Sequence, residues 1–590
     1  MFEVSVSNNL LKYEYSSVPE GFILTVENTG QMIEDCIIEV SVDLVSLKDG
    51  YVLFPGAVYG GNKADRIQGG QYPPRLSGFE ITSSKGPVII GDIPRWKDGI
   101  TQQTYDLTMP ACGIYHDNSH MGMILSTETG PVETPYGFCI KNEKASILFP
   151  CKRKERYRHC AVYEKSTDKG ILFNEGEKKQ FHFNIEKEVY KDRADFSAAM
   201  VRRHKKHVTC KYDYSFLLTR VVEKINRDEF DEENGFYMDS CESRRYQSGW
   251  VSGLITAYSM LLTDSPLSHE RAKSTIRFTV EKGMSPCGLP FGIYDKKGFR
   301  GLEPYDADSL DFAGTHVRRI YDAVLYMLRI AGLRKLEPEL SETLIETAFT
   351  SCHAIYKMIE DNGNCGHCVD LNTGKVLWGG SAAGVAGISC LCLGYDAGGP
   401  EKWLKQAEKA GEYYVRFNDM GYFTGGPGDI LMAPDSESNY AAMEAFFFLY
   451  TFTKNERWKK EFIRASQIMT TWICMSDYPF PTDSSYGKFG VRTRGLVMAN
   501  AQNKHLGPGV CTASAGLFNP AYQYTGDELF RGLFQMIYDA ASEVAKNFNG
   551  EIPENINVAD SLCNRGEFYK GHGIWTENAY ILMSLEKEYE

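Results

Sequence analysis

The chain has 590 residues, of which 43% are hydrophobic and 24% are charged, and its net charge is −13. This composition is ordinary for a soluble globular protein, and the length predicts two or three domains. An acidic chain lacks the basic surface that non-specific nucleic-acid binding needs, so we expect no nucleic-acid partner.

The N-terminal run "MFEVSVSNNLLKYEYSS" has no basic start followed by an apolar stretch, as a signal peptide would. No segment approaches the roughly 20 apolar residues of a membrane helix. The 16 cysteines are scattered along the chain, which is typical of reduced thiols. We therefore expect a cytoplasmic protein that makes no contact with a membrane.

Residues 1–187 are rich in short runs of Val, Ile, Phe and Thr that Gly, Asn, Asp and Pro divide. The runs are "FILTVENTG", "CIIEVSVDLVSL", "GFEITSS", "GPVIIGD", "MGMILSTETG", "ASILFP" and "KKQFHFNIEKEV". Their number and spacing predict an antiparallel β-sandwich domain. The charged stretch that follows, residues 188–213, is expected to form a linker helix.

From residue 214 to residue 590 the hydrophobic period becomes helical. Six segments mix small and aromatic residues and are apolar on nearly every face, which predicts buried helices. They begin at Tyr246, Asp311, Trp378, Ser438, Cys511 and Ile574. Amphipathic segments with one charged face alternate with them, so each unit of about 65 residues holds two helices.

Six such units predict six helical hairpins, and closing the last on the first gives an (α/α)6 barrel. The fold class is therefore a multidomain β + α protein with the sandwich first and the barrel second. An open solenoid is the alternative, but solenoid repeats are usually shorter and lack such long loops.

The connection that leads into each buried helix is long, whereas the connection that leaves it is mostly short. Long connections tend to be functional. All six long loops are expected at the end of the barrel that holds the N-termini of the inner helices. These loops carry many carboxylates together with Trp, Tyr and Arg, and this combination suits glycoside hydrolysis by two carboxylic acids.

A sandwich, a linker helix and six hairpins resemble the six-hairpin glycosidase superfamily, which includes bacterial glucoamylases and the maltose and cellobiose phosphorylases. The resemblance covers nearly the whole chain but is architectural, because no family motif can be carried over residue by residue. It implies an enzyme that acts on an oligosaccharide, with its catalytic acids in the loops described above.

Within that frame we expect one catalytic acid to be Asp435 or Glu437, in "APDSESNY" immediately before a buried helix. A carboxyl at the edge of an apolar wall tends to stay protonated, as a general acid must. We expect the second to be Glu577, in "GHGIWTEN", with Asp308 and Asp311 as close competitors.

Aromatic and basic residues of the same loops are expected to bind the substrate. They are Trp250, Tyr246, Arg244, Trp378, Arg492, Arg494, Tyr569, His572 and Trp575. Arginine pairs with carboxylates through two parallel hydrogen bonds, so we hypothesise that the substrate carries a uronic acid. The alternative is that these arginines are solvated or paired with neighbouring acids.

We expect no metal and no cofactor. His116, Asp117 and His120 lie in "YHDNSH", which is ordinary turn chemistry. The "CGHC" run from Cys365 to Cys368 is a single CxxC, which by itself is weak evidence for zinc.

Four other functions stay open. A polysaccharide lyase would use Tyr569 or His572 as base with Arg492 and Arg494, and a phosphorylase would place phosphate at "VRTRG" or "GGSAAG". The others are a sugar-binding protein without catalysis and an epimerase acting on free sugars. A homo-oligomer is compatible with any of these.

Overall fold

The computed structural model describes most of the chain. The described residues are 2–44, 50–64, 88–89, 99–158, 162–204, 212–240, 243–301, 314–426, 433–501, 504–509, 514–558, 565–568, 571 and 573–585. The strand expected in "GFEITSS" and the candidate residues Asp308, Asp311, Tyr569 and His572 lie outside this part of the chain.

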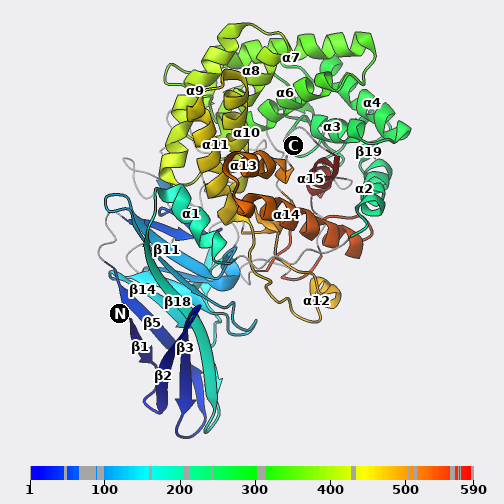
Figure 1. Cartoon of the computed structure of the whole chain (residues 1–590). Coiled ribbons are helices and arrows are strands. Elements are labelled where there is room, and N and C mark those ends of the chain that lie inside the picture. The colour runs from blue at the N-terminus through cyan, green and yellow to red at the C-terminus, as the bar shows by residue number, and fades with distance from the viewer. Residues whose placement is uncertain are drawn as a thin grey trace.

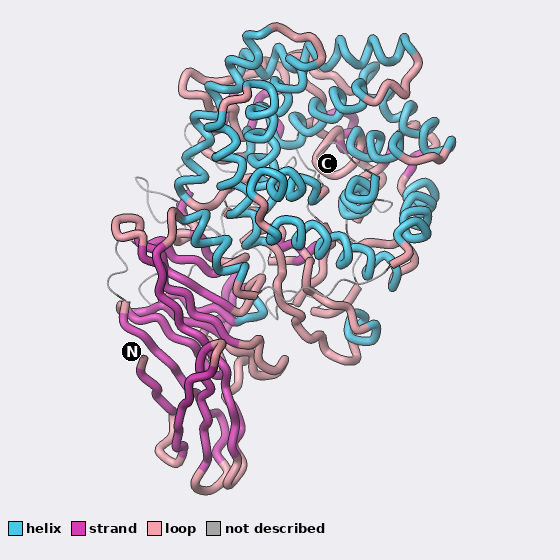
Figure 2. Tube along the Cα trace, in the orientation of Figure 1, coloured by secondary structure: helices cyan, strands magenta, loops and turns pink. Residues whose placement is uncertain are grey.

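Two large antiparallel sheets form the N-terminal part of the described chain (Figures 1 and 2). The seven-stranded sheet has the order β2 (Leu11–Val18), β3 (Gly21–Asn28), β18 (Lys178–Val189), β12 (Met121–Thr127), β11 (Ala111–His116), β6 (Gly50–Phe54) and β7 (Val58–Tyr59). The five-stranded sheet has the order β1 (Glu3–Val6), β5 (Ile38–Asp43), β14 (Lys144–Phe149), β13 (Gly137–Lys141) and β10 (Ile100–Gln103). Short ribbons pair β4 (Ile33–Cys36) with β17 (Ile171–Phe173), β8 (Lys63–Ala64) with β9 (Val88–Ile89), and β15 (Glu155–Arg158) with β16 (Val162–Lys165).

The two sheets share one hydrophobic core. Leu24 and Val26 of β3 contribute to it from one sheet, and Val40 of β5 and Ile147 of β14 from the other. Successive side chains of a strand point to opposite faces, so residues two apart enter the same core. The predicted order of the chain, with β-structure first and helices after it, is confirmed.

Helices fill the rest of the chain and alternate between two layers. The inner helices are α3 (Leu254–Leu262), α6 (Val317–Gly332), α8 (Ala386–Asp396), α10 (Ser436–Thr453), α13 (Phe518–Thr525) and α15 (Ile574–Leu585). The outer helices are α2 (Tyr214–Asp228), α4 (Pro266–Lys282), α7 (Pro338–Met358), α9 (Glu401–Met420), α11 (Glu456–Met469) and α14 (Glu528–Asn547). The connections out of the inner helices are short and those into them are long, as the sequence predicted.

The inner helices form a ring. Helix α3 packs against α6, α6 against α8, α8 against α10, and α15 closes back onto α3. Between α10 and α15 the ring is completed by α13 and the turn before it, η7 (Ala515–Leu517), which packs against α15. The Leu517 N–H donates to the Tyr440 hydroxyl of α10 at 3.2 Å. In this order α3 and α10 stand on opposite sides of the ring.

The first inner helix begins later than the sequence suggests. Residues Tyr246–Gln247 form the short strand β21, and α3 starts at Leu254, so the helix expected from Tyr246 is wrong for the stretch up to Gly253. Gly253 has a positive φ of +59°, and a Cβ there would lie 2.0 Å from the Gln247 carbonyl oxygen. This close approach requires glycine, and it bends the chain back before the helix can begin.

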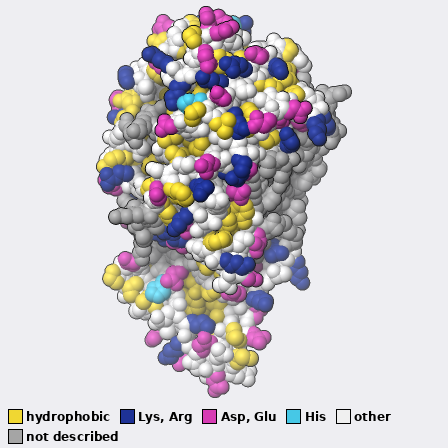
Figure 3. All heavy atoms as spheres, turned by 90° about the vertical axis from the view of Figure 1, so that its right-hand side faces the viewer, with side chains coloured by type: hydrophobic (Ala, Val, Ile, Leu, Met, Phe, Trp, Pro, Cys, Tyr) yellow, Lys and Arg dark blue, Asp and Glu magenta, His cyan; other side chains and the backbone are white. Residues whose placement is uncertain are grey.

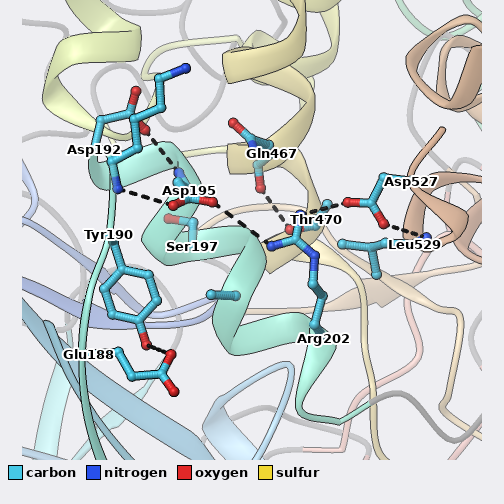
Figure 4. Close-up of polar contacts among 12 residues, drawn as sticks. Glu188, Tyr190, Asp192, Asp195, Ser197, Arg202, Gln467, Thr470, Asp527 and Leu529 are labelled. Carbon is cyan, nitrogen blue, oxygen red and sulfur yellow. Dashed lines mark hydrogen bonds and ion pairs between the residues drawn. The ribbon is translucent and has the colours of Figure 1, made fainter. Parts of the chain in front are cut away.

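A short helix, α1 (Arg193–Arg202), lies between the sheets and the barrel and packs against β11 and α11 (Figure 1). The Asp192 side chain caps it by accepting the Asp195 N–H at 2.9 Å. At the other end, Arg202 Nη2 lies 2.6 Å from Asp527 Oδ2, in the residue that caps α14 (Figure 4). Helix α1 therefore connects the sheet to two outer helices.

The seven-stranded sheet also packs directly on the barrel. The Tyr59 ring stacks on Trp472 with centroids 4.5 Å apart, and its hydroxyl lies 3.1 Å from Thr471 Oγ1. The Tyr51 hydroxyl donates to the Gly421 carbonyl oxygen at 2.9 Å. These tyrosines belong to the same buried cluster as the barrel helices, so sheet and barrel share a core.

Acidic and basic side chains are interspersed on the face of the molecule shown in Figure 3. None of the helices in the described chain is both long enough and apolar enough to span a membrane.

Candidate active site

The long connections into the inner helices pair with one another around the ring. Two of the contacts are strand pairings: β21 (Tyr246–Gln247) with β22 (Ile293–Asp295), and β24 (Gly314–His316) with β25 (Cys368–Asp370). Strand β22 also pairs with β23 (Gly298–Arg300) in its own loop. The remaining contacts join single residues: Ala382 with Thr424, Asp435 with Asn500, and Leu506 with Ile556. A strand, β26 (Val376–Trp378), extends the second pairing, and β27 (Val497–Met498) pairs with β28 (Leu506–Gly507) inside one loop. This chain of contacts runs from each loop to the next, so the loops gather at one end of the barrel.

Asp435 is the N-cap of α10 and is fully buried. One carboxyl oxygen accepts the Ser438 N–H at 2.6 Å, and the other accepts the Gly426 N–H at 3.1 Å and contacts the Ser438 hydroxyl at 3.0 Å. Burial raises the pKa of Asp435 to about 7, while the hydrogen bonds from Ser438 and Gly426 act to lower it. Asp435 therefore clamps the loop to the helix start with both of its oxygens.

Glu437 lies two residues further on, in the first turn of α10, and its exposed fraction is 4%. Its Oε2 accepts the indole N–H of Trp250 at 2.6 Å. Trp250 comes just before α3, which stands across the ring from α10. The hydrogen bond therefore joins the loop before α3 to the start of α10, on opposite sides of the ring.

Two arginines of α6 support this arrangement. Arg318 Nη1 donates to the Glu437 carbonyl oxygen at 3.0 Å, and its Nε lies 2.9 Å from both oxygens of Asp322. The Arg319 guanidinium lies 5.2 Å from the centre of the Trp250 ring. Burial raises the pKa of Asp322 to about 6, although Arg318 opposes this shift. The start of α10 and the Trp250 ring are thus fixed from the same helix.

Two histidines meet in the same region. The rings of His316 and His367 are 4.8 Å apart between centroids and are nearly perpendicular. His316 Nε2 lies 3.0 Å from the Gly425 carbonyl oxygen, next to the Gly426 N–H that binds Asp435. His367 Nδ1 lies 2.6 Å from Ser381 Oγ. Neither histidine was assigned a role in the site from the sequence. The one feature that could have indicated such a role is that both occur in long loops that lead into inner helices.

Glu577 does not join this group. It is fully buried in α15, with Oε1 2.6 Å from Lys224 Nζ of the outer helix α2, and the same Nζ lies 3.0 Å from Glu229. The buried ammonium lies between two carboxylates and offsets one of their two negative charges. The expected role of Glu577 as a second catalytic acid does not fit this position, because its carboxylate is committed to the contact between α15 and α2.

Tyr246 also points away from the rim, the end of the barrel where the long loops gather. It is fully buried, its hydroxyl lies 2.6 Å from Thr279 of the outer helix α4, and its ring packs edge-on against Phe236 and Phe278. In this position Tyr246 packs the loop against α4. Arg244, which has a positive φ of +49°, is exposed, and its guanidinium is 3.9 Å from Asp231.

The two arginines expected to bind a substrate carboxylate contact acids of the chain itself. Arg492 lies 2.5 Å from Glu543 of the outer helix α14 and also donates to the Tyr212 hydroxyl. The Arg494 guanidinium lies 3.6 Å from Asp477. These contacts favour the alternative in which the loop arginines pair with neighbouring acids.

Two tryptophans were also expected to bind the substrate. Trp575 is buried at the start of α15 and packs close to Gly507 in the neighbouring loop, where a Cβ would lie 2.8 Å from its ring. Trp378 ends strand β26, which places its backbone in the rim.

No group of three or more metal-binding side chains occurs among the described residues. His120 Nδ1 lies 2.8 Å from the Tyr115 hydroxyl, and Asp117 pairs with Arg193, so the "YHDNSH" turn is held by contacts of its own. Cys365 and Cys368 are buried free thiols, and burial raises the pKa of Cys365 to about 12.

No protein-family model and no curated protein matches this chain. Several solved structures are similar to it. A polysaccharide lyase is 10% identical, with a TM-score of 0.46 over 98% of this chain and 87% of its own. A cellobiose 2-epimerase from Bacillus thermoamylovorans B4167 is 12% identical, with a TM-score of 0.42 over 62% of this chain and 99% of its own.

An α-1,6-mannanase from Salegentibacter sp. HEL1_6 is 9% identical, with a TM-score of 0.39 over 63% of this chain and 100% of its own. The names of these three proteins are those of carbohydrate-active enzymes. At these TM-scores the likeness identifies no family.

Proposed function

We propose that this protein is a carbohydrate-active enzyme, and specifically a glycoside hydrolase that acts on oligosaccharides with Glu437 as one of its two catalytic carboxylates. The observation that carries this proposal is the contact between Glu437 and Trp250, which come from opposite sides of the ring and meet at 2.6 Å. Glycosidases need a carboxylate beside the scissile bond. An indole offers both a hydrogen-bond donor and an apolar face for a sugar ring.

Asp435 and Glu437 are given different tasks. Both oxygens of Asp435 are held by Gly426 and Ser438, so its task is to position the start of α10. Glu437 accepts a hydrogen bond from across the ring, and its proposed task is to protonate the leaving oxygen or to activate the attacking group. Loss of one general acid or base costs about 10²–10⁴ in rate.

The second carboxylate is assigned to Asp308 or Asp311. Both belong to the loop that leads to His316 and α6, and His316 contacts the Gly425 backbone beside the Asp435 clamp. The competing candidate, Glu577, is bound to Lys224. A substrate without a carboxylate is favoured, because Arg492 and Arg494 contact acids of the chain.

The test is turnover of a panel of nitrophenyl glycosides and nitrophenyl uronides by the wild type and by Glu437→Gln. We expect a neutral glycoside to be hydrolysed, and Glu437→Gln to lose about 10²–10⁴ in kcat/KM while its unfolding midpoint stays close to that of the wild type. Asp308→Asn and Asp311→Asn identify the second acid. Glu456→Gln is the matched control, because it removes an exposed acid from the start of α11.

Full activity of Glu437→Gln on the best substrate excludes its catalytic role. A product with the ultraviolet absorption of an unsaturated uronide indicates a lyase, and a strict requirement for inorganic phosphate indicates a phosphorylase. Binding of sugars with no turnover of any glycoside indicates the non-catalytic protein.

A further inference from the structure

We propose that His316 and His367 together form a subsite for one neutral hydroxyl group of a sugar, with His316 accepting a hydrogen bond from it and His367 donating one to it. This inference rests on the proposed function, because it names the chemical group that the same rim would bind.

The observation behind it is a pair of buried nitrogen atoms. His316 Nδ1 and His367 Nε2 have no hydrogen-bond partner within the part of the chain that the structure describes. The exposed fractions of these residues are 6% and 1%. A buried polar atom without a partner is costly, and such atoms in native proteins call for a water, an ion or a ligand.

The partner of His316 fixes its tautomer. The Gly425 carbonyl oxygen can only accept, so Nε2 of His316 carries the hydrogen and donates it over 3.0 Å. Nδ1 is then left with a lone pair. A group that fits this atom must donate a hydrogen, which a hydroxyl does and a carboxylate or a phosphate dianion does not.

The partner of His367 favours the complementary tautomer. Ser381 Oγ accepts the Ala383 N–H at 3.2 Å, so the hydroxyl hydrogen is free to point at His367 Nδ1, 2.6 Å away. His367 then carries its hydrogen on Nε2. One histidine thus presents an acceptor and the other a donor, and a hydroxyl group is the complement of such a pair because it both donates and accepts.

Both imidazoles stay neutral near pH 7. Burial, together with His367, Arg319 and Arg318, lowers the pKa of His316 well below its usual value, and burial lowers that of His367 to about 4. A neutral pair has no net charge with which to hold an anion. The same contacts connect the pair to the proposed active site, since Gly425 is followed by the Gly426 that binds Asp435.

The direct test is ¹⁵N-histidine NMR of the full chain during titration with neutral methyl glycosides of glucose, mannose and galactose. We expect the non-protonated Nδ1 signal of His316 and the protonated Nε2 signal of His367 to move together as one of these sugars saturates. Inorganic phosphate is the anion probe, and we expect it to move neither signal. A sugar that binds without moving them, or phosphate that moves them both, overturns the proposal.

A second test uses the monodeoxy forms of the sugar that binds, with affinity measured by calorimetry. We expect one deoxy position to weaken wild-type binding about 10–100-fold, because a site built for a hydroxyl is then left unpaired. In His316→Asn and His367→Phe the same deoxy change should cost little. An undiminished penalty in both folded variants places the hydroxyl elsewhere.

The two proposals fail in different ways. The binding tests need no turnover and can be run in Glu437→Gln. Histidine signals that respond in a protein without hydrolase activity support the subsite and exclude the hydrolase. Hydrolysis without a response of the histidine signals supports the hydrolase and excludes the subsite. Signals that respond to no sugar indicate that the two nitrogen atoms hold only a trapped water, which also excludes the subsite.

Discussion

At the scale of single residues, the protonation of Asp435 is set by its surroundings. The side chain is the N-cap of α10, a position where an acid is common because it accepts a free helix N–H. An exposed cap of this kind would be ionised. Complete burial instead raises the pKa of Asp435 to about 7, so that removing its proton in the folded protein is costly near neutral pH.

This shift predicts how stability depends on pH. The pKa of Asp435 is higher in the folded protein than in the unfolded chain. The protonated carboxyl therefore contributes its full stabilisation of the fold below about pH 4, and this contribution is lost as the pH rises through about 7. We expect wild-type stability to fall relative to Asp435→Asn over that interval, by on the order of 4 kcal/mol in total. Urea unfolding of both proteins from about pH 4 to about pH 8 measures the difference.

Asn also caps helices, so the substitution changes the offset between the two curves but should not add a pH dependence of its own. Ionisable groups common to both proteins cancel in the difference. Parallel curves across the whole range contradict the assignment of a raised pKa to Asp435.

Trp250 gives a second prediction at this scale. Its N–H binds Glu437 at 2.6 Å, and Trp250→Phe removes that donor while keeping an aromatic ring. Hydrogen bonds to charged groups contribute about 1.5–3 kcal/mol, so we expect kcat to fall about 10–100-fold if Trp250 positions the carboxylate. The pH profile of kcat should move as well, because the environment of the titrating acid changes. An altered KM with unchanged kcat and pH profile indicates that Trp250 only stacks on the substrate.

At the scale of elements, the inner helices do more than fill the barrel with apolar side chains. Arg329 of α6 lies 2.5 Å from Glu444 of α10, two helices that are separated in the ring by α8. Arg318 and Asp322 form a second ion pair within α6, nearer the rim. All four side chains are buried, so the interior of the barrel holds paired charges as well as apolar groups.

Removing one partner of such a pair leaves a buried charge uncompensated. We expect Arg329→Met alone and Glu444→Leu alone each to lower the free energy of unfolding by about 3–5 kcal/mol. The double variant should lose much less, because two apolar side chains of similar volume replace the pair. Denaturant unfolding of the four proteins gives the coupling energy, and simple addition of the two single losses contradicts a direct interaction.

At the scale of the whole molecule, the sheets and the barrel are joined by a continuous core. Tyr59 stacks on Trp472, Tyr51 binds the Gly421 carbonyl oxygen, and Tyr478 donates to the Leu107 carbonyl oxygen at 2.8 Å. Contacts of this kind stabilise neither part unless both are folded. The two parts are therefore expected to unfold together in a single transition.

A pair of substitutions tests this expectation. Tyr59→Ala removes a large buried side chain from the junction and should cost about 3–5 kcal/mol, by analogy with other aromatic truncations. Arg202→Ala breaks the pair with Asp527, where the two side chains are 37% and 27% exposed, and should cost at most about 1 kcal/mol. Calorimetry should show one transition in all three proteins. Separate transitions for the wild type contradict a shared core.

Much of this molecule can be predicted from local pattern. The period-2 runs became strands such as β3 and β18, and the amphipathic segments became the outer helices because each has one polar face. The inner helices were recognised, but four begin later than expected. Gly253 shows the reason, because a bend that depends on close backbone contact with Gln247 has no distinct signal in an apolar, glycine-containing run.

The sequence by itself determined the order of the parts, the two helices per repeat, the end of the barrel where the loops gather, and the place of Asp435 and Glu437 at the start of a buried helix. These follow from periodicity and connection length, which are properties of neighbouring residues. Only the tertiary structure decided which side chains meet. Glu437 and Trp250 are far apart in the chain, Glu577 is bound to Lys224 rather than to a rim partner, and His316 meets His367 without any spacing that predicts it. Ring closure brings these residues together, and contacts across a closed ring depend on the packing of every helix between them.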